Sequence, residues 1–381
     1  MKKYLHVLVF FIALVMVISC SEWKVTPKDF KLRGTIVFCG SSNGNVYALD
    51  TAGNEIWKFA TGRLINASPF FVDGILYIVN KIGTVYALDY STGKQKWKFS
   101  TDSVGGYGNK YSSPVVANGV LYVGSTDKNM YALDAATGEK KWNFPTGGEI
   151  KSSPAVYDGK VYFGSYDHTF YALDAKTGNK IWTARTGGPI WSSPAVSNQF
   201  PYVYIGSGDN NLYAFDIQTG ENKWSYPTKG AVDSSPLVSA RYRIIYVGSR
   251  DQKVYALDAL NGKVNGSTKW EFKTDDLIFS SPTIDDSTLY IGNDKGKIFA
   301  LSATTGKPKW EFLTNNFVSS SPVIANGILY IGSYDTKFYA VNIITQKPKW
   351  IFDDAQVEGA PIVVQDGKVI GAYPSISGVV N

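Results

Sequence analysis

Tryptophan recurs at a nearly constant interval along almost the whole chain. Eight tryptophans follow one another at spacings of 40, 45, 40, 42, 46, 40 and 40 residues: Trp57, Trp97, Trp142, Trp182, Trp224, Trp270, Trp310 and Trp350. A unit of about forty residues therefore repeats eight times, and a period of this length is typical of solenoids and propellers. Residues that recur in every unit are expected to build the unit. Function is therefore sought in the residues that change between units.

Each repeat contains four short runs of apolar and β-branched residues separated by turn residues. In the third repeat, Ser-Ser-Pro at 112–114 precedes the first run, Asn118-Gly119 follows it, and Trp142 lies in the last run. Asn-Gly between two such runs favours a tight hairpin, because both central residues of that turn take positive φ. The pattern predicts four antiparallel strands in each repeat. A sheet of this size cannot bury both faces alone, so neighbouring repeats must stack.

The two ends of the repeat region complement each other. The first repeat lacks the Ser-Ser-Pro strand and begins at residues 35–38, whereas residues 359–364 supply a strand of that type after the last repeat. A further strand-like run follows at residues 368–370. The C-terminal strand can therefore complete the N-terminal blade and close a ring without open sheet edges. We predict an all-β fold over residues 34–381, an eight-bladed β-propeller of four-stranded antiparallel blades. A β-solenoid is the alternative, but its repeats are usually shorter.

The pattern Ala-x-Asp-x-x-Thr-Gly-x-x-x-Trp resembles the tryptophan-docking repeat of the pyrroloquinoline quinone (PQQ) propeller superfamily over residues 34–373. The resemblance implies that the eight repeated tryptophans dock neighbouring blades and that the strand with the proline lies innermost. Departures affect single turns, since Ser302 and Asn342 replace the turn aspartate and Gln346 replaces the turn glycine.

The N-terminus has the form of a bacterial lipoprotein signal. Lys2 and Lys3 precede a mostly apolar run over residues 5–18, which is too short to span a bilayer, and Cys20 follows. We expect residues 1–19 to be a signal peptide, Cys20 to be lipidated and residues 20–33 to form a polar tether. Ser21 favours the outer membrane, on its periplasmic side or with surface exposure as the alternative. Ordinary signal cleavage, with an unmodified thiol, is the other interpretation.

Charge and cysteine content limit the partners and the covalent structure. Removal of the signal leaves 36 basic and 32 acidic residues, scattered without runs, so nucleic acid is not an expected partner. If Cys20 carries lipid, Cys39 has no partner for an intrachain disulfide. Cys39 follows Phe38 in a strand-like run and is expected to be a small buried apolar residue.

The residues needed for catalysis are scarce. His168 is the single histidine of the expected mature chain, which is too few for a metal cluster, and a solvated turn residue is the simple interpretation. Three acidic pairs fall at turns of different repeats: Asp275-Asp276, Asp285-Asp286 and Asp353-Asp354. The aspartate of the repeated Gly-Ser-x-Asp motif is interpreted as structural because it recurs. We expect no catalytic residue, no metal and no cofactor.

The residue that precedes each Ser-Ser-Pro-like strand varies strongly between repeats. These eight residues are Asn66, Tyr111, Lys151, Trp191, Asp233, Phe279, Ser319 and Glu358. If the proline strand is innermost, they surround one mouth of the channel, where mixed aromatic and charged groups are typical of binding sites. Trp191 is notable because it lies outside the repeated tryptophan position. Insertions at 102–110 and 263–268 are further candidates, and a merely wet mouth is the alternative.

The expected function is a non-catalytic, lipid-anchored scaffold for protein–protein interaction. The resemblance is to lipid-anchored superfamily members without cofactor machinery, and it implies a monomer with a protein partner in the machinery that assembles outer-membrane β-barrels. A cell-surface sensor or adhesin that binds a glycan or small ligand is the alternative. A PQQ-dependent oxidoreductase is the third hypothesis. The resemblance implies that such enzymes hold PQQ over a tryptophan floor with a calcium ion and a catalytic aspartate, and that they often have an adjacent cysteine pair and carry long insertions. The chain lacks the cysteine pair and the insertions.

Overall fold

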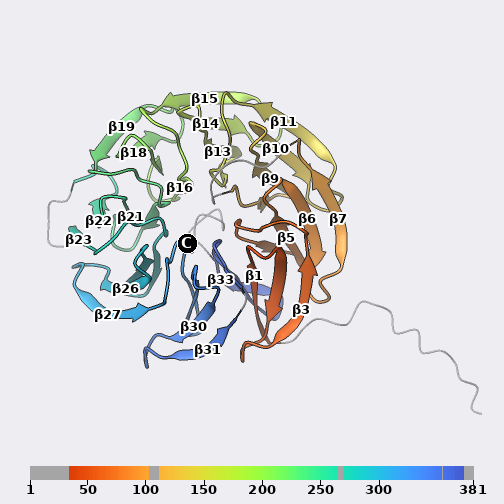
Figure 1. Cartoon of the computed structure of the whole chain (residues 1–381). Coiled ribbons are helices and arrows are strands. Elements are labelled where there is room, and N and C mark those ends of the chain that lie inside the picture. The colour runs from red at the N-terminus through yellow and green to blue at the C-terminus, as the bar shows by residue number, and fades with distance from the viewer. Residues whose placement is uncertain (1–33, 103–110, 264–268, 354, 373–381) are drawn as a thin grey trace, which may run out of the picture. The chain divides into compact units, whose positions relative to one another are not determined.

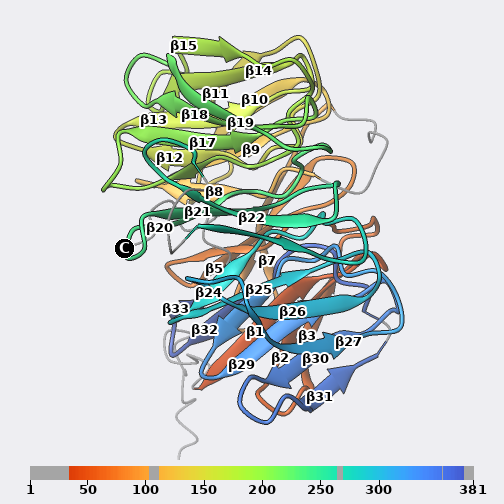
Figure 2. The same ribbon diagram turned by 90° about the vertical axis from the view of Figure 1, so that its left-hand side faces the viewer.

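The structure is a computed structural model that describes residues 34–102, 111–263, 269–353 and 355–372. These residues lie in one compact unit, Leu32–Asn381. They form eight antiparallel sheets arranged as a ring (Figure 1), which Figure 2 shows from the side. The described ranges contain no helix of the length and hydrophobicity that a membrane crossing requires. The predicted eight-bladed propeller is confirmed.

The first strand of each blade lies against the axis, where these strands contact one another. From blade 2 to blade 8, and then blade 1, they are β4 (Phe70–Val72), β8 (Val115–Ala117), β12 (Ala155–Tyr157), β16 (Ala195–Val196), β20 (Leu237–Ser239), β24 (Thr283–Asp285), β28 (Val323–Ala325) and β32 (Ile362–Gln365). The second strands, from blade 1 to blade 8, are β1 (Thr35–Gly40), β5 (Ile75–Val79), β9 (Val120–Gly124), β13 (Lys160–Gly164), β17 (Tyr202–Gly206), β21 (Ile244–Gly248), β25 (Thr288–Gly292) and β29 (Ile328–Gly332).

The third and outer strands complete each blade. In the same order the third strands are β2 (Asn45–Leu49), β6 (Thr84–Asp89), β10 (Asn129–Asp134), β14 (Thr169–Asp174), β18 (Asn211–Asp216), β22 (Lys253–Asp258), β26 (Lys297–Ser302) and β30 (Phe338–Asn342). The outer strands are β3 (Glu55–Ala60), β7 (Gln95–Ser100), β11 (Lys140–Pro145), β15 (Lys180–Arg185), β19 (Asn222–Pro227), β23 (Trp270–Lys273), β27 (Pro308–Leu313) and β31 (Pro348–Phe352).

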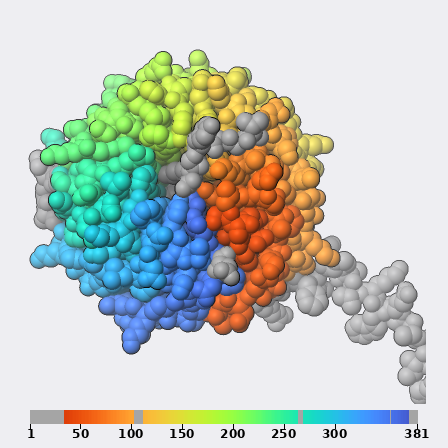
Figure 3. All heavy atoms as spheres, in the orientation of Figure 1, coloured from red at the N-terminus to blue at the C-terminus, as the bar shows by residue number. Residues whose placement is uncertain are grey.

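Ring closure follows the complementarity of the two chain ends. Strand β32 pairs antiparallel with β1, with Thr35 opposite Gln365 and Phe38 opposite Ile362. The first and last coloured segments consequently lie side by side in Figure 3. Blade 1 also has a fifth strand, β33 (Lys368–Gly371), which pairs with β32 on the axial side. The sequence indicated a strand at this place without indicating where it pairs.

Burial follows the position of a strand within its blade. The second strand β13 is buried at four consecutive residues, because neighbouring blades cover both of its faces. The outer strand β11 instead alternates between exposed and partly buried residues, since only one face packs on a neighbour. Apolar clusters consequently span pairs of adjacent blades, and one of them joins Val37 and Leu49 of blade 1 to Tyr330 and Trp350 of blade 8.

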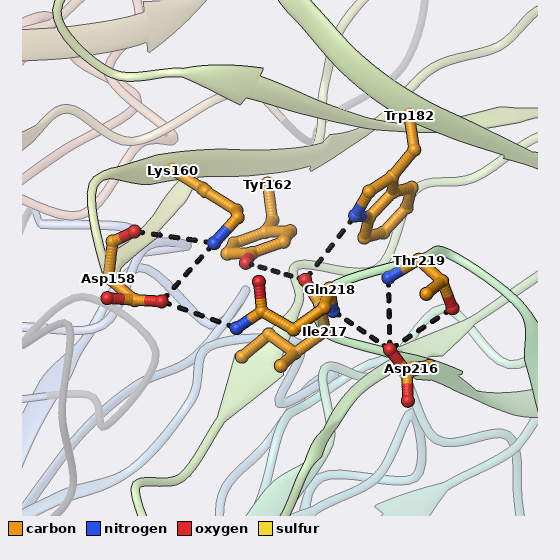
Figure 4. A network of polar contacts seen from close by, with 8 residues as sticks. All are labelled: Asp158, Lys160, Tyr162, Trp182, Asp216, Ile217, Gln218 and Thr219. Carbon is orange, nitrogen blue, oxygen red and sulfur yellow. Dashed lines mark hydrogen bonds and ion pairs between the residues drawn. The ribbon is translucent and has the colours of Figure 1, made fainter.

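The repeated tryptophans dock each blade onto the next, as Figure 4 shows for blades 4 and 5. The indole N–H of Trp182 donates to the Ile217 carbonyl at 3.3 Å, and the Tyr162 hydroxyl donates to the same oxygen at 3.2 Å. The Asp216 carboxylate accepts the Thr219 amide at 2.9 Å and so holds the receiving turn. Equivalent indole bonds are made by Trp57, Trp97, Trp142 and Trp270.

The turn glycine makes room for the docked indole. Gly178 has φ +73°, and a Cβ placed on it would lie 2.7 Å from the Trp142 ring. Both the conformation and the contact exclude a side chain there. In blade 8 the corresponding residue is Gln346, which takes φ 60° with its side chain present. Positive φ strains a residue that carries a Cβ. We therefore expect the turn at Gln346 to be less stable than the turns that have glycine at this position.

Candidate binding site at the channel mouth

One cavity of about 570 Å³ lies at a mouth of the channel, lined by residues of all eight blades. The loops that enter it run from each outer strand to the first strand of the next blade. All eight variable residues predicted from the sequence line this cavity: Asn66, Tyr111, Lys151, Trp191, Asp233, Phe279, Ser319 and Glu358. The structure thus brings them together in one place, whereas their role in binding stays a prediction.

Below this rim, hydrogen bonds join the first strands into a belt of serines. The Ser153 amide donates to the Ser193 hydroxyl at 3.0 Å, and the Ser193 amide donates to the Ser235 hydroxyl at 2.9 Å. The same bond links the other neighbouring blades, from Ala360 of blade 1 round to Ser321 of blade 8. The second serine of Ser-Ser-Pro is therefore structural, and it forms the polar floor of the cavity.

A second set of variable residues also lines the cavity, and the sequence reasoning missed it. It occupies the x position of Gly-Ser-x-Asp, between the second and third strands, and its lining members are Tyr166, Arg250, Asp294 and Tyr334. The sequence contains a signal for this set, because the position holds seven residue types in the eight repeats: Ser42, Lys81, Thr126, Tyr166, Gly208, Arg250, Asp294 and Tyr334. The repeated aspartate of Gly-Ser-x-Asp, which follows this position, is a structural element, as the sequence predicted.

That aspartate links a blade to the preceding loop. In blade 4, Asp167 accepts the Tyr171 hydroxyl at 2.6 Å and the Gly147 amide at 2.8 Å. Burial, and after it the hydrogen bond to the Asp167 carboxylate, raises the pKa of Tyr171. His168 follows in the same turn with φ 66°, and its amide donates to the Ser165 carbonyl.

Arg250 is held rigidly on one side of the cavity. Its Nε and Nη2 donate to a single oxygen of Asp233, at 2.7 and 2.5 Å. The guanidinium carbon lies 4.8 Å from the Phe279 ring centroid and 5.3 Å from that of Trp191. Two aromatic faces and one carboxylate therefore fix the position of this cation.

Trp191 and Lys151 form an adjoining group. The indole N–H of Trp191 donates to the Tyr166 hydroxyl, and a Cβ on Gly208 would lie 2.8 Å from the indole. Glycine at the variable position of blade 5 thus accommodates Trp191. Lys151 is buried with its Nζ 3.0 Å from Glu149 and 4.6 Å from the Tyr166 ring centroid. This side of the mouth is tightly packed in advance of any ligand.

Two carboxyl groups on the other side of the cavity have no such cationic partner. In the described part of the chain, neither Asp294 nor Glu358 forms an ion pair. Burial, with the nearby charge of Asp276, raises the pKa of Asp294 to about 6, against a hydrogen bond from Ser319. Burial also raises the pKa of Glu358, against hydrogen bonds from Tyr334 and Gln356 and the more distant charge of Lys81, and Glu358 accepts the Asn66 amide at 3.0 Å.

Other candidate residues lie away from the mouth or outside the described residues. Asp275 accepts the Asn293 amide, and Asp286 pairs with Arg241 at 2.6 Å on the surface. Cys39 is buried in β1, and burial raises the pKa of its thiol. Cys20, the signal and tether (1–33), Asp354, and the inserted segments 103–110 and 264–268 fall outside the described residues.

The described residues at the mouth do not fit a quinone–calcium centre. Calcium prefers six or more converging oxygens, and across the described ranges no three acidic, histidine or cysteine side chains gather closely enough to hold a metal. The cavity floor is a belt of serines rather than a tryptophan face, and Trp191 lies at the side with Arg250 over its ring.

Comparisons with known proteins indicate the family and the fold. The family model described as outer membrane protein assembly factor BamB matches residues 23–108, 104–198, 184–277 and 264–376. No curated protein gave a sequence match. BamB from Moraxella catarrhalis is similar in structure, with a TM-score of 0.64 and 22% identity over 80% of this chain and 89% of that one.

Two other solved structures share the fold at lower sequence identity. The computationally designed protein Ika8 gives a TM-score of 0.66 and 17% identity, covering 81% of this chain and 96% of that one. A europium-containing methanol dehydrogenase gives a TM-score of 0.65 and 17% identity, covering 81% of this chain and 84% of that one. At such identities the likeness concerns the fold alone.

Proposed function

The chain belongs to the family of the outer membrane protein assembly factor BamB, and from this membership we propose that it is a non-catalytic scaffold that serves outer-membrane protein assembly. The observation that carries the proposal is the extent of the family match, whose segments together span residues 23–376. Under this proposal the propeller presents a rigid surface, and its partner is a protein of the cell envelope, such as a component of the barrel assembly machinery.

We propose the channel mouth as the docking surface. The strand and turn signature recurs from repeat to repeat, whereas the two variable sets concentrate aromatic and charged side chains at this one mouth. Tryptophan, tyrosine and arginine are the residues that contribute most to protein interfaces, and Trp191, Tyr166 and Arg250 adjoin one another here. Their fixed positions lower the entropic cost of binding a partner.

The N-terminal segment is proposed to attach the scaffold to the membrane. Residues 1–19 would be removed as a signal, Cys20 would be lipidated, and residues 20–33 would separate the anchor from the propeller. A periplasmic position on the outer membrane agrees with service to a barrel assembly machine. Labelling with a radioactive fatty acid tests the anchor, since Cys20→Ser would abolish incorporation.

A small ligand or glycan is the second candidate occupant of the mouth. The observation that favours it is the cavity itself, whose volume of about 570 Å³ lies in the range of ligand pockets. A PQQ-dependent oxidoreductase is less favoured, because the residues present do not fit the quinone–calcium centre. Added PQQ and calcium would restore dye-linked alcohol or sugar oxidation if that hypothesis were right.

Site-specific photocrosslinking in the native cell envelope tests the docking surface. A crosslinking amino acid replaces Tyr111 at the mouth, and a matched control replaces Ile344, which is 83% exposed in the turn before β31 on the opposite face. We expect Tyr111 to capture an outer-membrane assembly component that the control does not. Equal capture from both positions would refute the mouth as the docking surface.

Truncation of Trp191 supplies an independent measurement. We expect Trp191→Ala to keep the propeller folded, because this indole lies outside the inter-blade docking positions, and to weaken capture of the partner in a pull-down. A variant that folds and captures the partner as well as the unmodified protein would count against the proposal.

A further inference from the structure

The charges around the mouth cavity do not balance. Its two cations each have a carboxylate of their own, because Arg250 is paired with Asp233 and Lys151 with Glu149. The remaining lining carboxyls are Asp294 and Glu358, which lack ion pairs in the described part of the chain. The unmatched charge of the cavity is therefore negative, and it lies on the side of blades 7 and 8.

Asp294 is the better placed of the two to receive a ligand. Its carboxylate accepts one side-chain hydrogen bond, from Ser319 at 3.3 Å, whereas Glu358 accepts amides of Asn66 and Gln356 at 3.0 and 2.9 Å. A carboxylate accommodates more than one donor. Arg250 is near enough to influence Asp294, but its Nε and Nη2 are already engaged by Asp233. Asp294 thus retains acceptor capacity toward the cavity.

Aromatic rings line the same cavity near this carboxylate, because Ser319, which donates to Asp294, lies two residues after Phe317. Phe317 and Tyr334 also line the cavity, and their ring centroids are 6.0 Å apart. Phe317 is 49% exposed, although it is a large apolar side chain. An exposed aromatic ring and a carboxylate without an ion pair in one cavity suit a cation, because the ring quadrupole attracts positive charge and the carboxylate supplies the counter-ion.

We propose that the side of the mouth formed by Asp294, Phe317 and Tyr334 binds a cationic side chain, a lysine ammonium or an arginine guanidinium, of the partner polypeptide. The ammonium or guanidinium donates to the Asp294 carboxylate, and the aliphatic stem packs on Phe317. The polypeptide source of the cation depends on the scaffold function proposed above, whereas the cation site itself does not.

An anionic ligand would not suit this side of the cavity. It would meet Asp294 and Glu358, together with Asp276 nearby, and like charges in a partly dehydrated site repel strongly. An uncharged ligand would leave both carboxylates without a direct ion pair among the described residues, although Arg250 and Lys81 act on them from farther away. A cation is therefore the complementary ligand class.

Calorimetric titration of the full-length protein in detergent tests the proposal. The probes are blocked Gly-Ser peptides that carry one central lysine, arginine, norleucine or glutamate. Norleucine has the stem of lysine without its charge. We expect saturable binding of the lysine and arginine peptides and no binding of the norleucine or glutamate peptides. Equal binding of the norleucine peptide would overturn the charge-based recognition.

Variants locate the site. Asp294→Asn preserves the shape of the side chain and removes its charge, and we expect it to lower the affinity for the lysine peptide by about tenfold or more. Asp286→Asn is the matched control, because Asp286 is an exposed carboxylate in the hairpin between β24 and β25, and we expect no change. Phe317→Leu, which keeps an apolar side chain, should weaken binding less. Unchanged affinity in Asp294→Asn would refute the site.

A free amine separates the two sources of a cation. If n-butylammonium bound as tightly as the lysine peptide, the polypeptide part of the proposal would be overturned. If the proposed scaffold function were wrong but the cation site right, the lysine peptide would still bind through Asp294, while crosslinks from the mouth would capture no assembly component.

Discussion

Asp294→Asn is expected to make the protein more stable, although it is expected to remove a binding group. The pKa of Asp294 is raised from 3.8 to about 6 by burial and by Asp276, so the folded state disfavours the ionised carboxylate. At about 1.36 kcal/mol for each pKa unit, this rise corresponds to about 3 kcal/mol. Because the group is only partly buried, screening by water reduces the expected gain to about 1–2 kcal/mol.

The pH dependence has a definite sign. A carboxyl whose pKa is higher in the folded than in the unfolded state contributes stability that is present below the unfolded value and lost as pH rises through the folded value. The free energy of unfolding of the unmodified protein should therefore equal that of Asp294→Asn at pH 3.5. Between pH 4 and about pH 6 it should become smaller than that of the variant. Above about pH 7 the difference should be constant.

The assay is urea unfolding followed by tryptophan fluorescence at several pH values. Asp233→Asn is the control of opposite sign, because it removes the counter-ion of Arg250 and is expected to destabilise the protein at pH 7. The same ionisation should affect binding, since protonation of Asp294 near pH 6 should lower the affinity for the lysine peptide. A stability difference that is absent at pH 8, or that grows toward low pH, would refute the reasoning.

Three further predictions concern the docking of blades and the buried thiol. Trp142→Ala should cost about 3–5 kcal/mol of unfolding free energy, because it removes an indole docked on the next blade; a loss below about 1 kcal/mol would contradict that role. Gln346→Gly should raise the thermal midpoint, with a gain of about 1 kcal/mol from relief of positive φ, whereas Gly178→Ala should lower it; the same sign in both variants would show the strain argument wrong. Cys39 should resist maleimide labelling until the protein is unfolded, because it is buried and its pKa is raised; rapid labelling of the folded protein would contradict its burial.

The architecture was predictable because the same strand and turn pattern occurs in all eight repeats, so each copy supports the interpretation of the others. The tryptophan spacing gave the number of blades, and the missing first strand of blade 1 matched the surplus strand near Ile362. The pairing of β33 could not be predicted, since a short apolar run does not specify which edge it joins. It depends on the room left at the axis beside β28, where Gly371 packs against Ala325.

The candidate site was predictable in part. The rim residues differ between repeats that share one strand and turn signature, and all eight line one cavity. The contact of Arg250 with Trp191 could not be predicted, because it joins two blades through side-chain geometry that the pattern does not contain. The excess of negative charge in the cavity could not be predicted either, because it depends on which carboxylates form ion pairs with Arg250 and Lys151 in the folded protein. Tyr166 and Asp294 were overlooked although their position varies visibly.

The seam between β1 and β32 has a consequence for biogenesis. The Gly34 amide bonds to Asp366, 332 residues later in the chain, so the first sheet cannot acquire its axial strand until nearly the whole polypeptide has been made. Until then β1 offers an unpaired backbone edge, which is prone to wrong partners. The growing chain therefore has most need of chaperone protection at its beginning, and that need ends when its last strands arrive.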